Sequence, residues 1–73
     1  MKNKLPIGEY LLGYRKEHGV TQAALGALLG VSAAAVSKWE RQQSYPDIFL
    51  LPDISKLLGI SIDILLGTQS ISL

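Results

Sequence analysis

The sequence predicts an all-α fold, a compact bundle of five short helices. Apolar residues recur at the spacings of three and four positions that mark one face of a helix. Glycines follow the apolar segments, and Ser, Thr or Asp precedes most of them, which is typical of helix ends. The alternation typical of a strand is not convincing in any segment before the last few residues.

The composition indicates one small domain that is held together by apolar burial. The chain has 73 residues, of which 48% are hydrophobic, with no cysteine and a single histidine. Disulfides, thiolate metal sites and histidine clusters are therefore excluded, and we expect no metal and no cofactor. The predicted domain spans residues 1–67, and the last segment, residues 68–73, is a tail, a linker stub or an edge strand.

The first predicted helix runs from about Leu5 to His18. Ile7, Leu11 and Tyr14 would form its buried face, and Gly19 would end it.

Two further helices follow with almost no linker between them. Thr21 is a good N-cap for the segment TQAALGALL, which would bury Leu25 and either Leu28 or Leu29. Gly30 can end that helix in a left-handed conformation, and Ser32 caps the next one, which runs to about Arg41. So tight a glycine turn makes the two helices cross steeply, as in a helix-turn-helix.

The last two predicted helices carry the remaining apolar residues. Asp47 would cap a fourth helix that ends at Gly59, and its buried face would comprise Ile48, Leu51, Ile54 and Leu58. Ser61 would cap a last short helix, SIDILL, before Gly67.

Charge is distributed unevenly along the chain. The net charge is +1, but residues 1–45 hold six cations and three anions, whereas residues 46–73 hold one cation and three anions. No segment is apolar over the roughly 20 residues of a membrane span, and the N-terminus lacks the apolar stretch of a signal peptide. We therefore expect a cytoplasmic protein that does not bind membranes.

The third predicted helix has two different faces. Ala35, Val36 and Trp39 fall on one side, which we expect to pack inward. The other side is small at its start and cationic at its end, with Ala33, Ala34, Ser37, Lys38 and Arg41. Such a face suits the major groove and phosphates of DNA, but an alanine-rich solvated helix would look the same. The residues alone leave both interpretations open.

A resemblance favours DNA. Arg15, the pair TQ at the start of the second helix, the turn GVS, the segment SKWE and the closing GISID occur in one characteristic order and spacing. From about Ile7 to Gly67 the chain thereby resembles the phage repressor and Cro-type (XRE-like) helix-turn-helix family, which comprises DNA-binding transcription regulators. The resemblance covers more than four fifths of the chain.

The resemblance implies which residues contact DNA. The start of the third helix would meet base edges, and Gln22 would contact the DNA backbone and brace that helix. Arg15 and Glu40 would form an ion pair between the first and third helices. The complete set of expected DNA-binding residues is Thr21, Gln22, Ser32, Ala33, Ala34, Ser37, Lys38, Arg41, Gln42 and Gln43.

The chain departs from the family pattern in three places. Alanines replace the polar residues that are common early in the third helix, so direct base readout would depend on Ser32, Ser37 and Lys38, together with DNA shape. Gly26 stands where alanine is usual. Phe49, Leu57 and Ile64 are apolar at often polar positions, and they are candidates for the interface of a homodimer that reads a near-palindromic operator.

The expected function is sequence-specific binding of double-stranded DNA by a transcription regulator, a repressor that occupies an operator. One alternative is an antitoxin-type module that uses the fold to bind a protein partner. Another is a relative that has kept the fold only for dimerisation. We expect no enzymatic activity, because the sequence has no glycine-rich phosphate loop and no carboxylate pair outside capping positions.

Overall fold

Five α-helices and one short 3-10 helix make up the fold in a computed structural model that describes residues 5–68. The helices are α1 (Ile7–His18), α2 (Gln22–Leu29), α3 (Ala33–Glu40), η1 (Ile48–Leu50), α4 (Leu51–Leu58) and α5 (Ile62–Leu65). Residues 5–68 contain no strand, which confirms the predicted all-α class. Of the predicted tail, only Thr68 lies within the described residues, and residues 1–4 of the predicted domain also lie outside them.

Local hydrogen bonds set most of the helix ends where the sequence predicts them. The hydroxyls of Thr21, Ser32 and Ser61 each accept a hydrogen bond from a backbone N–H in the first turn of the helix that follows. The residues that follow α1, α2 and α4 are glycines with φ between 64° and 76°, the left-handed region that glycine adopts readily. None of the helices within residues 5–68 is long and apolar enough to cross a membrane.

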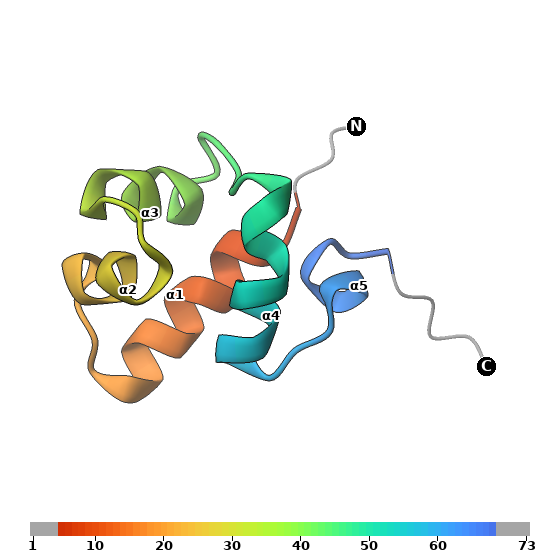
Figure 1. Ribbon diagram of the computed structural model, residues 1–73, viewed down its shortest axis with the longest axis horizontal. Coiled ribbons are helices and arrows are strands. Elements are labelled where there is room, and N and C mark those ends of the chain that lie inside the picture. The colour runs from red at the N-terminus through yellow and green to blue at the C-terminus, as the bar shows by residue number, and fades with distance from the viewer. Residues whose placement is uncertain (1–4, 69–73) are drawn as a thin grey trace.

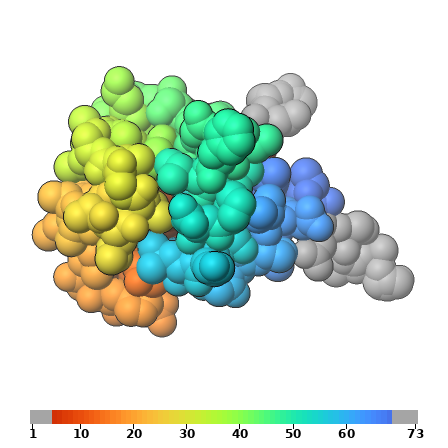
Figure 2. Space-filling view, in the orientation of Figure 1, coloured from red at the N-terminus to blue at the C-terminus, as the bar shows by residue number. Residues whose placement is uncertain are grey.

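Helix α1 lies at the centre of the fold (Figure 1). It contacts α3 on one side and α4 on the other, while α2 packs most closely against α3. In the space-filling view, α2 and α3 form the left side of the molecule and α5 lies towards the right (Figure 2). The buried core draws on all five helices and consists of Ile7, Leu11, Leu25, Leu29, Val36, Trp39, Leu51, Ile54 and Leu65.

The α1–α3 crossing depends on a close backbone contact that the sequence does not predict. Gly8 is buried, and a Cβ atom at this position would collide with the carbonyl oxygen of Trp39. The two helix backbones can approach this closely only because residue 8 has no side chain.

The predicted buried face of the fourth helix was wrong at its first residue. Ile48 is 71% exposed, whereas Leu51 and Ile54 are buried as predicted. The carboxylate of Asp47 accepts a hydrogen bond from the N–H of Phe49 at 3.0 Å and caps η1, so the α-helical register begins only at Leu51. The tighter 3-10 turn changes the direction of the preceding side chains, and Ile48 points to solvent. In α2, Leu25 and Leu29 are buried, and Leu28 is exposed.

Candidate nucleic-acid interface

The turn between α2 and α3 is built from consecutive caps. Gly30 has φ 76°, and the N–H of Val31 donates to the carbonyl of Gly26 at 2.8 Å. The hydroxyl of Ser32 then accepts from the N–H of Ala35 at 3.1 Å and starts α3. A Cβ atom on Gly26 would lie 2.5 Å from the carbonyl oxygen of Val31, which gives a physical reason for glycine where the resemblance implies alanine. The helices therefore cross within a very short turn.

The inward and outward faces of α3 lie as the helical periodicity predicts. Val36 and Trp39 are buried, and Ala35 is half-buried against the core. On the outward face, Ala34 and Lys38 are exposed, while the remaining residues at the expected base-reading positions, Ser32, Ala33 and Ser37, are exposed or half-buried. The outward side chains make no contribution to the buried core, so they are available to a ligand.

An ion pair joins the end of α3 to α1. The Arg15 guanidinium holds the Glu40 carboxylate in a two-point contact, from Nε to Oε2 at 2.7 Å and from Nη2 to Oε1 at 2.8 Å. The Glu40 side chain is 5% exposed and that of Arg15 is 18% exposed. Arg15 Nη1 also donates to the carbonyl of Val20 at 3.1 Å, which fixes the guanidinium plane. The paired geometry is the strong form of such a contact.

The ion pair stabilises the charged forms of Arg15 and Glu40. Burial alone would raise the pKa of Glu40, but hydrogen bonds from Arg15 and Gln22, with the positive charges of Arg15 and Lys16, lower this pKa overall. The hydrogen bond to Glu40 raises the pKa of Arg15. Both groups are therefore charged at neutral pH.

Gln22 is attached to the same carboxylate. Its Nε2 atom donates to Glu40 Oε1 at 3.0 Å. A side-chain amide nitrogen carries two hydrogens, so one remains for another acceptor. Thr21, one residue earlier, uses its hydroxyl oxygen to accept from the N–H of Ala24 at 3.0 Å. The first turn of α2 is thus held in a fixed orientation beside α3.

The cations at the end of α3 are exposed. Arg41 Nε donates to the carbonyl oxygen and the hydroxyl of Ser37 at 3.3 and 3.2 Å, which holds the side chain along the helix. No hydrogen bond occupies the terminal amino groups of Arg41 within residues 5–68, and Lys38 projects one turn earlier. These two cations give the end of α3 its positive charge.

The helix ends with a residue in an unexpected conformation. Gln42 has φ 63°, the left-handed region that glycine usually occupies, and its residue type gave no signal of this. Its Oε1 atom is buried without a hydrogen-bond partner among the described residues, whereas Gln43 is exposed. The buried Oε1 atom is closed to a ligand, so any hydrogen bond from this side chain to a ligand would come from its Nε2 donor.

The three residues expected at a dimer interface differ in exposure. Phe49 in η1 is 86% exposed. Leu57 lies at the other end of α4 and packs partly against the core, and Ile64 of α5 is half-buried. Within residues 5–68, no group of three or more His, Cys, Asp or Glu side chains could hold a metal ion.

Comparison with known proteins relates this arrangement to one family. A helix-turn-helix family model matches residues 12–65. The chain is 43% identical over 60 residues to repressor protein C2 of Salmonella phage P22, a match that covers 82% of this chain and 28% of the repressor. It is also 36% identical to the HTH-type transcriptional activator BcrR of Enterococcus faecalis, over 92% of this chain and 33% of the activator. The chain thus spans about a third or less of the length of these two relatives.

The same fold occurs in solved structures. The crystal structure of the P22 c2 repressor in complex with a synthetic operator matches with a TM-score of 0.77 and 40% identity, over 92% of this chain and 100% of that chain. Hydroxypropylphosphonic acid epoxidase from S. wedmorenis matches with a TM-score of 0.68 and 25% identity, over 96% of this chain and 41% of that chain. The fold is therefore also found as part of a larger enzyme.

Proposed function

We propose that this chain, which belongs to the helix-turn-helix family, is a DNA-binding transcription regulator that inserts α3 into the major groove. The observation that carries the proposal is the outward face of α3. It has small side chains at the helix start and two exposed cations at or beside its end. A helix of this shape can approach base edges closely, while Lys38 and Arg41 reach phosphates at the end of the helix.

The proposed base contacts come from few groups. Ser32 accepts from Ala35, which leaves its hydroxyl hydrogen for a base acceptor, and Ser37 has the same capacity because its oxygen accepts from Arg41. Lys38 can donate to guanine, and the methyl groups of Ala33 and Ala34 can pack on thymine methyls. Further discrimination would come from DNA shape.

The proposed backbone contacts surround this face. The free hydrogen of Gln22 Nε2 is oriented by the Glu40 carboxylate, and Thr21 lies beside it at the start of α2. Lys38, Arg41 and Gln43 with the amide nitrogen of Gln42 would hold phosphates at the other end. We infer that the protein acts as a repressor that occupies its operator, in the cytoplasm.

Replacement of Lys38 with alanine is expected to weaken DNA binding about tenfold, because a charge-assisted contact is lost. The slope of log affinity against log salt should fall by about one unit. The control is Lys56→Ala, which removes an exposed cation of α4 away from α3. Titration of a selected duplex at several salt concentrations, followed by fluorescence anisotropy, measures both quantities.

Gln22→Ala should weaken binding less, without unfolding the protein. The docking face is wrong if Lys38→Ala, Arg41→Ala and Gln22→Ala all leave affinity and salt dependence unchanged. It is also wrong if Lys56→Ala has the same effect as Lys38→Ala.

We further propose that the protein binds a near-palindromic operator as a homodimer through Phe49, Leu57 and Ile64. The strongest support is Phe49, an aromatic side chain that is almost fully exposed. Light scattering at high micromolar concentration, with and without operator DNA, should give twice the monomer mass, and Phe49→Ser should reduce it. A monomeric mass under both conditions would refute the homodimer.

A further inference from the structure

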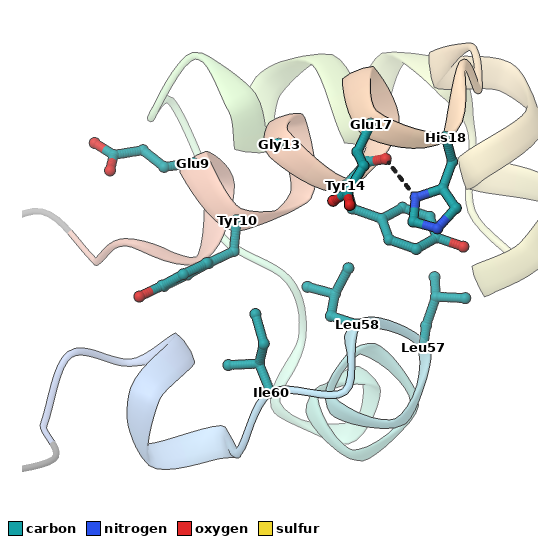
Figure 3. A pocket seen from close by; sticks show the side chains of 9 residues that line it. All are labelled: Glu9, Tyr10, Gly13, Tyr14, Glu17, His18, Leu57, Leu58 and Ile60. Atoms are coloured by element: carbon teal, nitrogen blue, oxygen red, sulfur yellow. Dashed lines mark hydrogen bonds between the residues drawn. The ribbon is translucent and has the colours of Figure 1, made fainter.

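A groove lies between α1 and the end of α4, with a volume of about 480 Å³ (Figure 3). Residues from three successive turns of α1, as far as its last residue, line one side, and Leu57, Leu58 and Ile60 line the other. No residue of α2, α3 or the loop after α3 contributes to the lining. The groove is therefore separate from the proposed DNA interface, and both could be occupied at once.

The floor of the groove is apolar and its centre is open. Tyr14 faces Leu57 and Leu58 across the groove, and Tyr10 lies on the side of Ile60 (Figure 3). All of these side chains keep part of their surface exposed. Tyr14 stacks on His18 with ring centroids 4.2 Å apart, and His18 Nδ1 lies 3.0 Å from the Tyr14 carbonyl oxygen. Gly13 lies between the tyrosines, and a Cβ atom there would meet nothing within 4 Å. An apolar side chain of a ligand could thus approach the α1 backbone at Gly13.

The rim of the groove is acidic. Glu9 and Glu17 lie four residues before and after Gly13, so the three positions share one face of α1. The two carboxylates are exposed, and neither forms an ion pair with another of residues 5–68. Eight residues of helix place them about 12 Å apart. No lysine or arginine lines the groove, so its net charge is negative.

We propose that this groove binds a basic, apolar peptide segment of a partner protein. An apolar side chain of the segment sits over Gly13, between the tyrosines and the leucines. Two Lys or Arg residues pair with Glu9 and Glu17, and in an extended segment they are about four residues apart. The negative rim repels nucleic acid, so the groove gives a DNA-bound protein a second surface for protein contacts.

A selection of random 12-residue peptides on the intact 73-residue chain tests this proposal. We expect enriched peptides to combine Lys or Arg with Leu, Phe or Trp. A fluorescent copy of the most enriched peptide should bind with a micromolar dissociation constant that rises with salt. The double variant Glu9→Gln/Glu17→Gln should weaken this binding about fivefold. The matched control is Asp53→Asn, which removes an exposed carboxylate outside the groove and should change nothing.

A variant that blocks the groove distinguishes peptide binding in the groove from non-specific electrostatic binding elsewhere on the surface. Gly13→Leu adds a large side chain at a position that lines the groove, and it improves helix propensity, so it should fold and lose at least nine tenths of the peptide affinity. Lys38→Ala should leave the affinity unchanged. The proposal is overturned if no peptide or only acidic peptides are enriched, or if Gly13→Leu binds normally. Leu57 also belongs to the proposed homodimer interface, so the dimer is tested at the α1 side of the groove instead. The proposal is also overturned if Gly13→Leu makes the protein monomeric, since a second copy of the chain would then occupy the groove.

Discussion

Replacement of Glu40 with glutamine is expected to lower the free energy of unfolding by about 3 kcal/mol. The change removes the charge opposite the mostly buried Arg15 guanidinium and breaks their two-point contact. Only one acceptor oxygen then remains for the donors of Arg15 and Gln22. Domains of this size have total stabilities of about 4–11 kcal/mol, so the loss is a large fraction. Urea denaturation followed by Trp39 fluorescence measures it.

The control for Glu40→Gln removes both charges together. Arg15→Met/Glu40→Leu should be more stable than Glu40→Gln, because it leaves no uncompensated charge in the contact. If Glu40→Gln has wild-type stability, the ion pair does not hold α1 to α3.

Glu40→Gln should also change how the free energy of unfolding depends on pH. The pKa of Glu40 lies below its ordinary value of 4.5 in the folded protein, so the unfolded chain takes up a proton at a higher pH than the folded one. The contribution of Glu40 to the free energy of unfolding is therefore fully present above pH 4.5, and it decreases as the pH falls through the pKa of the folded protein. Glu40→Gln should show a shallower loss of stability in acid than the wild type.

Replacement of Gly8 with alanine is expected to lower the free energy of unfolding by about 2 kcal/mol. The added methyl would collide with the Trp39 carbonyl oxygen, and both colliding groups are fixed to helix backbones. Relief therefore requires α1 and α3 to separate, which opens the core and outweighs the gain of up to about 1 kcal/mol in helix propensity.

Gly13→Ala is the matched control for Gly8→Ala. Both residues lie in α1, but a methyl at Gly13 meets open space, so this change should stabilise the protein by about 0.5–1 kcal/mol. Thermal denaturation of the two variants should show opposite shifts in Tm. A rise in Tm for both would contradict the close contact.

The sequence predicts the structural features that depend on residues close to one another in the chain. The caps at Thr21 and Ser32 and the left-handed Gly30 are determined within three or four positions, so residue type indicates them. The two faces of α3 follow from the helical period alone. Ile48 was misplaced because its direction depends on whether Asp47 caps a 3-10 turn or an α-helix, and both begin with the same residues.

Features that depend on distant contacts were not predicted. Gly8 is constrained by Trp39, which is 31 positions away, and nothing in the local sequence of Gly8 distinguishes it from the unconstrained Gly13. The left-handed backbone conformation of Gln42 could not be predicted either, because glutamine is not typical of that conformation. The ion pair of Arg15 and Glu40 could be expected only from the resemblance, since a helical pattern does not specify partners 25 positions apart.

The ion pair has a consequence for how the protein can evolve. Glu40, Val36 and Trp39 attach α3 to the rest of the domain through its inner side alone. Ala33, Ala34 and Ser37 lie outside the buried core, so we expect substitutions there to change the free energy of unfolding little. Under the proposed function, the same scaffold could acquire a different operator by point mutation, because Ala33 and Ala34 would leave room at the base-reading end of α3 for larger side chains.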